Sequence, residues 1–139
     1  MFKQLSVYLR NTPGELSKFC SLLIEHDIEI RAITVAESEK YGLILLLVDK
    51  PDDCIDLLDK EQYSVSLTMV LAVKIDSENN TKGLREISKL LGDNNVNIDY
   101  LYSTLVKDES LIILKVDDNK KAQEVLEKSG FIFENRHSV

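Results

Sequence analysis

The sequence predicts an α+β fold made of two copies of one β-α-β-β-α-β module, over residues 1–69 and 70–139. Two observations predict it. The chain aligns with itself at a constant shift of 68 residues without a gap (Leu16 onto Leu84), and each half repeats one order of strand-like and helix-like apolar patterns. A chain of 139 residues has room for two small domains, so we expect two similar modules joined directly.

Matched positions in the two halves carry the duplication. They fall in helices, strands and loops alike, which chance matches between unrelated halves would not do. The matched pairs are Leu22 with Leu90, Leu23 with Leu91, Ile30 with Ile98, Leu43 with Leu111, Ile44 with Ile112, Leu46 with Leu114, Val48 with Val116, Asp49 with Asp117, Leu58 with Leu126 and Lys60 with Lys128.

The first half reads as strand, helix, two strands and helix. Alternating apolar residues predict a strand over Gln4–Leu9, and the turn sequence Asn11–Gly14 precedes a helix. Further strands are predicted over Ile28–Val35 and Leu43–Val48, and Pro51 opens a second helix. The helix positions expected to face the core are Leu16, Phe19, Cys20, Leu23, Cys54, Leu57 and Leu58.

The second half repeats this order. Strands are predicted over Leu71–Ile75, Val96–Val106 and Leu111–Val116, with a short final strand over Phe131–Phe133. This is the split βαβ, ferredoxin-like pattern, in which an antiparallel sheet carries both helices on one face. The helix positions expected to face the core are Leu84, Ile87, Leu90, Leu91, Ala122, Val125 and Leu126.

The junction between the halves has no glycine-, proline- or serine-rich linker. Every odd position from Val65 to Ile75 is apolar. We therefore expect the last strand of the first module to continue into the first strand of the second, which would lock the modules into one rigid body.

Composition, charge and missing motifs argue against several classes of function. A net charge of -7 and a pI near 4.8 argue against nucleic acid or an anionic membrane as the partner. The N-terminus lacks the layout of a signal peptide, and two cysteines without metal-ligand spacing fit a reducing compartment. A cytoplasmic protein without a metal or other cofactor is expected. The usual hydrolase, metalloprotease, phosphate-loop and redox motifs are missing, so we expect no enzyme.

The third strands of the two halves are aliphatic, at 43–48 and 111–114. RNA recognition motifs share this element order but need exposed aromatic residues on the central strands and a basic surface, so that function is not favoured. Aliphatic residues on both faces of a strand indicate that both sides of the sheet are covered. The cover could come from the companion module, a regulated enzyme or a second subunit, and we predict a homodimer.

Asn11–Gly14 is the strongest candidate for a binding site. Glycine permits positive φ and close approach to the backbone, and the helix that follows offers unpaired N–H groups and a positive dipole end, which suit a carboxylate. Asn11 could accept from an ammonium group or donate to a carboxylate. Taken alone, these four residues are more typical of an ordinary strand-to-helix turn than of a binding site.

The sequence from Val7 to Leu16, with Phe19, Leu23 and Ile28–Ile30, resembles the ACT domain signature, which the second half echoes over Asn95–Tyr102. The likeness is closest to stand-alone tandem ACT proteins, regulatory modules that bind amino acids. It implies a ligand between modules, held by the first strand-to-helix loop and the neighbouring second strand. The residues implicated in the first module are Asn11, Thr12, Pro13, Gly14, Glu15, Leu16, Ile30, Ala32 and Ile33.

The second module departs from this pattern. The shift places Asn79 opposite Asn11 but Lys82 opposite Gly14, with Gly83 displaced by one residue. The Cβ of Lys82 would crowd the backbone, although its ammonium group could pair with a carboxylate, so the sequence leaves a second site open. Tyr100 and Tyr102 alternate on one strand and fit a pocket wall or an interface equally well.

The sequence therefore predicts a non-catalytic regulatory protein that binds a small ligand, a free amino acid, at an inter-module or dimer interface. The alternative is a protein–protein regulatory module of a metabolic enzyme in which the ligand site is vestigial.

Overall fold

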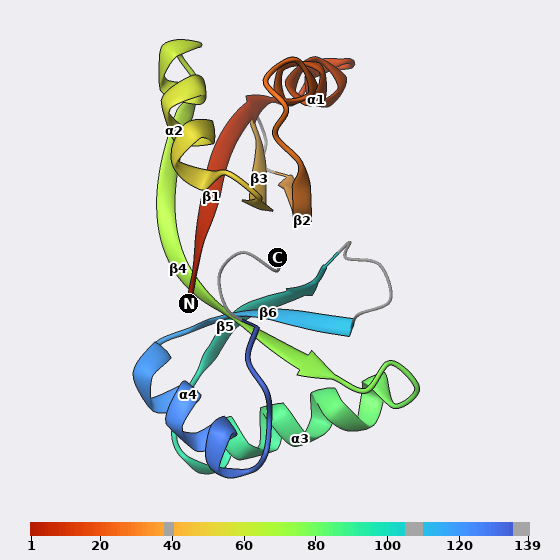
Figure 1. Ribbon diagram of the computed structural model, residues 1–139, viewed down its shortest axis with the longest axis vertical. Coiled ribbons are helices and arrows are strands. Elements are labelled where there is room, and N and C mark those ends of the chain that lie inside the picture. The colour runs from red at the N-terminus through yellow and green to blue at the C-terminus, as the bar shows by residue number, and fades with distance from the viewer. Residues whose placement is uncertain (38–40, 105–109, 135–139) are drawn as a thin grey trace. The chain divides into compact units, whose positions relative to one another are not determined.

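The computed structural model describes residues 1–37, 41–104 and 110–134 (Figure 1). It has the predicted β-α-β-β-α-β order from β1 to β4 and repeats that order from β4 onward, with a bridge in place of the last strand. The chain divides into two compact units between Thr68 and Met69, and Met1–Phe2 belongs with the second. The elements are β1 (Phe2–Arg10), α1 (Glu15–Glu25), β2 (Ile30–Glu37), β3 (Tyr41–Val48), α2 (Pro51–Lys60), β4 (Ser64–Ile75), α3 (Asn80–Asp93), β5 (Ile98–Ser103), β6 (Ser110–Val116) and α4 (Asn119–Lys128).

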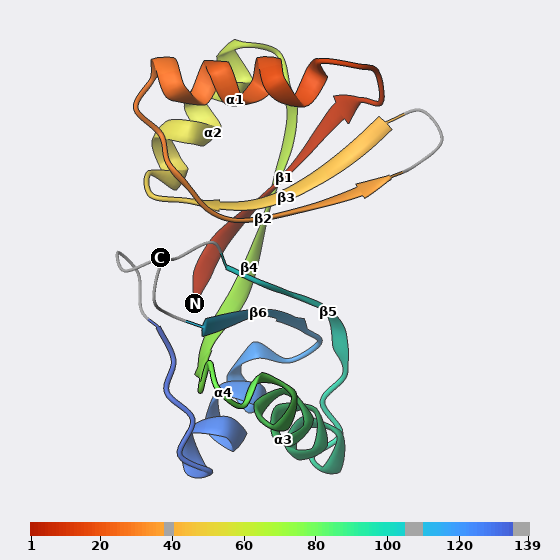
Figure 2. The ribbon, with the colours of Figure 1, turned by 90° about the vertical axis from the view of Figure 1, so that its right-hand side faces the viewer.

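In the N-terminal module the strand order is β2-β3-β1-β4, and β1 and β2 both pair antiparallel with β3. Helices α1 and α2 cover one face of these strands (Figure 2). Their apolar stripes meet the odd positions of β1, as the alternation predicts. The buried core consists of Leu5, Val7, Leu9, Phe19, Leu23, Ile28, Ile44, Leu46, Val48, Cys54, Leu57 and Leu58.

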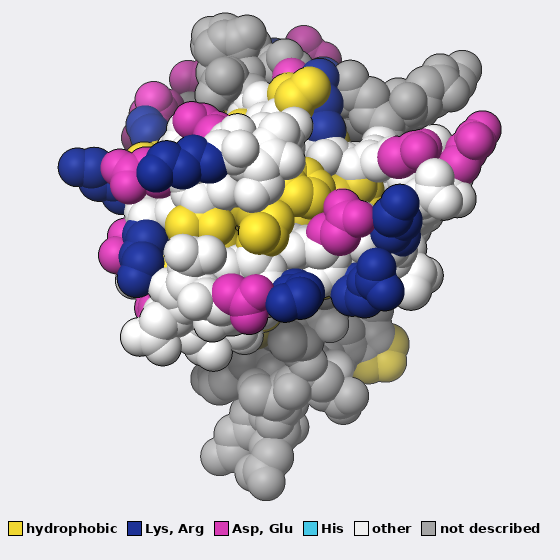
Figure 3. Space-filling model, turned by 90° about the horizontal axis from the view of Figure 1, so that it is seen from below, with side chains coloured by type: hydrophobic (Ala, Val, Ile, Leu, Met, Phe, Trp, Pro, Cys, Tyr) yellow, Lys and Arg dark blue, Asp and Glu magenta, His cyan; other side chains and the backbone are white. Residues whose placement is uncertain are grey.

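The C-terminal module repeats this arrangement with the strand order β4-β6-β5. Helices α3 and α4 pack on one face, and on their outer side lysine and arginine side chains are interspersed with aspartates and glutamates (Figure 3). The buried core consists of Leu71, Val73, Ile87, Leu91, Val96, Ile112, Leu114, Val116, Ala122 and Leu126.

The junction is one continuous strand, because β4 runs unbroken from Ser64 to Ile75 and pairs in both modules. This confirms that the last strand of the first module continues into the first strand of the second. The rigid-body expectation and the boundary at residues 69 and 70 stay predictions.

Details of the backbone repeat as well as the elements. The β2–β3 pairing shifts register between Ile30 and Ala32, and the β5–β6 pairing shifts between Ile98 and Tyr100, at the same place in the repeat. The matched aspartates have one role: Asp49 accepts a hydrogen bond from the amide of Glu29 at 2.9 Å, and Asp117 accepts one from the amide of Asn97 at 3.0 Å. In each module, this hydrogen bond joins the residue before the second strand to the aspartate after the third strand.

Some predictions need correction. The final strand over Phe131–Phe133 is only a bridge between Phe133 and Val73, flanked by hydrogen bonds of Ile132 and Glu134 to β4. The strand predicted over Val96–Val106 is shorter, because Val96 follows a helix-terminal turn and residues 105 and 106 lie outside the described part of the chain.

Four helix positions expected in the core are only partly buried: Cys20, Leu84, Leu90 and Val125. Leu16 is 43% exposed. Each lies toward the edge of its helix stripe, where the sheet no longer covers it. None of the described helices combines the length and the apolar character needed to cross a membrane.

Candidate functional site

The predicted loop enters α1 through Gly14, which has a positive φ of 87° and lies at the N-cap position. This conformation favours glycine because a Cβ is disfavoured there. A Cβ built on Gly14 would meet no atom within 4 Å, so the backbone here is open to the surroundings. No side chain caps the helix, and the amide of Glu15 reaches the carbonyl of Thr12 at 3.4 Å. The first turn thus keeps N–H groups available for an anion.

The side chains around this backbone are accessible. Asn11, Thr12, Pro13 and Gly14 are exposed and Glu15 is half-buried. Leu16, which was expected in the core, is instead exposed at the start of α1. The part of these residues in ligand binding stays a prediction.

The predicted second-strand residues lie elsewhere in this module. Ile30 and Ile33 are packed against the helix-side core, and Ala32 is fully buried. Strand β3 lies between β2 and β1, so these residues do not adjoin the Asn11–Gly14 loop of their own module. Their role in ligand binding stays a prediction.

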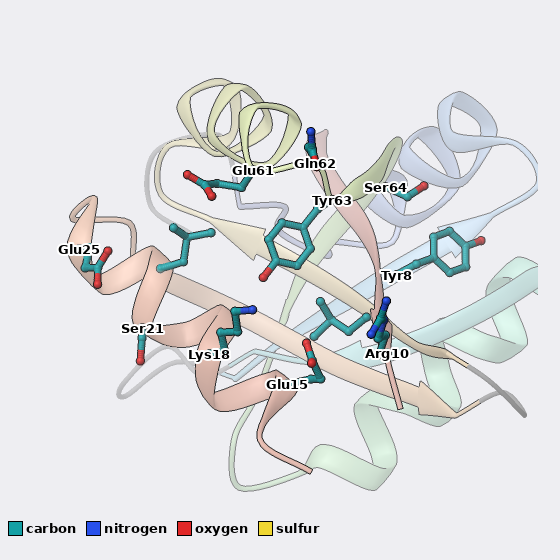
Figure 4. Close-up of a pocket in the computed structure, with 12 residues that line it drawn as sticks. Tyr8, Arg10, Glu15, Lys18, Ser21, Glu25, Glu61, Gln62, Tyr63 and Ser64 are labelled. Carbon is teal, nitrogen blue, oxygen red and sulfur yellow. The ribbon is translucent and has the colours of Figure 1, made fainter. Parts of the chain in front are cut away.

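A groove of about 740 Å³ lies beside the loop, between α1, the end of β1 and the turn from α2 into β4 (Figure 4). The predicted residue Glu15 forms part of its wall. Charged side chains that the sequence analysis missed are Arg10, Lys18, Glu25 and Glu61. In sequence they are scattered surface charges, and only the fold brings them to one groove.

Tyr63 stands in the middle of this groove, with its hydroxyl pointing toward α1 (Figure 4). Its ring packs edge-on against Phe19, with centroids 5.6 Å apart and an interplanar angle of 78°, which anchors the ring to the core. Burial, and then the carboxylates of Glu15 and Glu61, raise the pKa of the Tyr63 hydroxyl. Tyr63 therefore stays a neutral hydrogen-bonding group at neutral pH.

The corresponding loop of the second module is built differently. Asn79 is the N-cap of α3, with a φ of −133°, and its side-chain amide donates to Asp76 Oδ2 at 2.9 Å. The amide of Glu78 and then the side chain of Asn79 lower the pKa of Asp76. The predicted residue Lys82 is exposed in the first helical turn.

Gly83 has a packing role. It lies inside α3, and a Cβ there would come within 3.2 Å of Ile75 Cβ and 3.3 Å of Ile75 Cγ2. The glycine lets α3 approach β4 closely. Gly83 therefore differs from Gly14 in its role as well as in its position in the repeat: Gly83 permits close packing, whereas Gly14 permits a positive φ at the start of its helix.

A cavity of about 390 Å³ lies beside the first turn of α3, lined by Asn80, Thr81, Ser103, Thr104 and Ser110 with apolar neighbours. Ser110 donates to Asn80 Oδ1 at 3.0 Å. The buried hydroxyl of Thr104 has no hydrogen-bond partner in the described part of the chain. The internal repeat does not predict this cavity, because the equivalent positions of the first module carry no such hydroxyls.

Tyr100 and Tyr102 stack on one another, with ring centroids 6.5 Å apart. Burial, and then Tyr100, raise the pKa of Tyr102. Neither tyrosine is among the described residues that line the groove beside α1 or the cavity beside α3.

The cysteines show no sign of reactivity. Cys54 is fully buried, and burial followed by the charge of Asp49 raises its pKa to about 11. Cys20 is half-buried. Among residues 1–37, 41–104 and 110–134, no three histidine, cysteine, aspartate or glutamate side chains group as metal ligands.

Comparisons with known proteins agree with the repeat and the fold. A family model described as an ACT domain pair matches residues 1–138, whereas no curated protein matches. Protein BT0572 from Bacteroides thetaiotaomicron superimposes with a TM-score of 0.86 at 23% identity, covering 98% of this chain and 93% of that one.

Two further crystal structures relate the fold to aspartate kinases. The ligand-free regulatory subunit of aspartate kinase from Thermus thermophilus gives a TM-score of 0.68 at 12% identity, covering 92% of each chain. The aspartate kinase of Clostridium acetobutylicum gives 0.56 at 14% identity, covering 92% of this chain and 33% of that one. At these identities the likeness is one of fold. The resemblance seen in the sequence is confirmed by the family match, and the chain belongs to the ACT domain pair family.

Proposed function

We propose that this protein is a non-catalytic regulator that binds a free amino acid through the loop and first turn of α1. Membership of the ACT domain pair family and a fold shared with an aspartate kinase regulatory subunit support a regulatory role. The observation that carries the proposal is the uncapped, open start of α1 at Gly14. Amides at such a helix start bind a carboxylate, the group that all α-amino acids share.

The rest of the proposal is chemical. The ligand's carboxylate accepts from first-turn amides of α1, and its ammonium group meets acceptors of the loop. The site lies at an interface between ACT modules or between subunits, as the family resemblance implies. Binding biases the interface, and a coupling free energy of about 1–3 kcal/mol is enough to regulate a partner.

The test is titration calorimetry of the full chain with each of the twenty amino acids, repeated with Gly14→Val. Valine at a φ of 87° is strained and places a branched side chain where the ligand's carboxylate would lie. We expect at least one amino acid to bind and Gly14→Val to abolish that binding.

The chain offers a matched control. Gly130 has a φ of 91° and an equally open Cβ position, but it follows α4, far along the chain from the loop. Gly130→Val imposes the same backbone strain, so it should lower stability similarly and leave the affinity unchanged. Heat with none of the amino acids, together with co-purification of a metabolic enzyme, would instead support the protein–protein regulatory module with a vestigial site.

A further inference from the structure

The groove beside α1 carries charges of both signs. Arg10 and Lys18 face it together with Glu15, Glu25 and Glu61 (Figure 4). The ion pairs among the described residues all involve other side chains. These side chains line a volume within the range of small-molecule sites.

The second module contains the same groove in a reduced form. A cavity of about 220 Å³ there is lined by Asp76, Gly83, Glu86 and Phe131, which the 68-residue shift places at Tyr8, Glu15, Lys18 and Tyr63. Phe131 stands at the position of Tyr63 and has no hydroxyl group. The carboxylate of Glu15 is replaced by a glycine that has no space for a side chain.

The two grooves thus share a framework, and both carry charges of both signs, since Lys74 and Lys82 also line the second. They differ in where those charges lie and in the hydroxyl of Tyr63. The framework follows from the fold, because it is formed by the same elements in both copies. The hydroxyl, the cation at Lys18 and the carboxylate at Glu15 do not follow from the fold, since the second module folds without them. A requirement other than packing accounts best for this set of side chains.

We propose that the groove of the first module, which adjoins the Gly14 loop and shares Glu15 with it, is a second ligand site that takes a small zwitterion. The ammonium group of the ligand pairs with Glu15 and Glu61, and no proton is transferred. Its anionic group pairs with Lys18 and Arg10, and Tyr63, fixed on Phe19, donates a hydrogen bond from the groove floor. A ligand with only a positive charge, or only a negative charge, would leave the groove side chains of one sign without a partner.

The test uses calorimetry on the full chain with glycine betaine, phosphocholine and the twenty amino acids as probes. The variant Lys18→Glu/Tyr63→Phe gives the first groove the side chains that the second module carries at Glu86 and Phe131. Both residues are already tolerated by the fold at equivalent positions, and the phenylalanine keeps the ring contact with Phe19. The matched control is the reverse exchange, Glu86→Lys/Phe131→Tyr, in the second module.

We expect at least one probe to bind and its affinity to fall about tenfold or more in Lys18→Glu/Tyr63→Phe, since a charged hydrogen bond and an ion pair are lost. The reverse exchange and Gly14→Val should leave this affinity unchanged. Unchanged affinity in Lys18→Glu/Tyr63→Phe, an equal loss in the control, or no binding by any probe would overturn the inference.

These variants also separate the inference from the function proposed above. Binding lost only in Gly14→Val would refute the groove site and leave the loop site standing. Binding lost only in Lys18→Glu/Tyr63→Phe would support the groove and refute the loop assignment.

Discussion

Gly83 and Gly92 lie in the same helix, α3, in opposite surroundings. A Cβ at Gly83 would meet the branched Cβ and Cγ2 of Ile75, at 3.2 and 3.3 Å, whereas a Cβ at Gly92 would meet nothing within 4 Å. Alanine is favoured over glycine inside a helix by about 1 kcal/mol. A steric clash of the added Cβ can reverse this preference for alanine. Comparing the two positions therefore distinguishes the effect of helix propensity from the effect of packing.

We expect Gly92→Ala to raise the free energy of unfolding by about 0.5–1 kcal/mol. Gly83→Ala should instead lower it by about 1 kcal/mol or more, because the atoms of Ile75 close to its backbone cannot move aside cheaply. Urea denaturation followed by circular dichroism measures both. A stabilising Gly83→Ala would show that α3 can shift away from β4, and that Gly83 has no packing role.

The four helices in the described part of the chain end in the same way. The residue after the C-cap has a positive φ, at Asp27, Gln62, Asn95 and Gly130. The next amide bonds back to the fifth carbonyl before it, for example Tyr63 to Leu58 at 2.9 Å and Phe131 to Leu126 at 3.0 Å. This is the Schellman motif, with an apolar residue following the turn. Glutamine is the least suited of the four to this conformation, and the repeat places Gly130 at its position.

Gln62→Gly should therefore stabilise the protein. Relief of the left-handed conformation gains about 1–2 kcal/mol and the more flexible unfolded chain offsets about 0.4–1 kcal/mol, which leaves a net gain of about 0.5–1 kcal/mol. Asn95→Gly is the control and should gain less, since asparagine tolerates this conformation. Chemical denaturation gives both values, and a lower midpoint for Gln62→Gly than for the parent chain would contradict the argument.

The elements were predictable because local patterns and the fold agree. Leu5, Val7 and Leu9 alternate in sequence and all enter the core, and the internal repeat predicted most elements in both halves. The Asn11–Gly14 loop was predictable because its chemistry is contiguous in sequence. The groove was not, because Arg10, Lys18 and Tyr63 come from three elements and each alone resembles an ordinary surface or core residue.

At the scale of the whole molecule, the homodimer stays a prediction, but the structure changes the reason for it. The aliphatic residues Leu45 and Leu47 of β3 are only 9% and 2% exposed in the single chain. Leu67 and Met69 of β4, by contrast, are 47% and 38% exposed and, two residues apart, share one face of the strand.

Exposed large apolar side chains on a strand suit an interface better than water. We expect sedimentation equilibrium at micromolar concentration to show a dimer, and Leu67→Ser/Met69→Ser to shift it toward monomer. Ile24→Ser is the control: Ile24 is 76% exposed but stands singly on α1, so its loss should not change the mass. If the parent chain sediments as a monomer, the prediction is wrong. If it is a dimer that Leu67→Ser/Met69→Ser leaves intact, the interface lies elsewhere, because burial of two such side chains would contribute several kcal/mol to association.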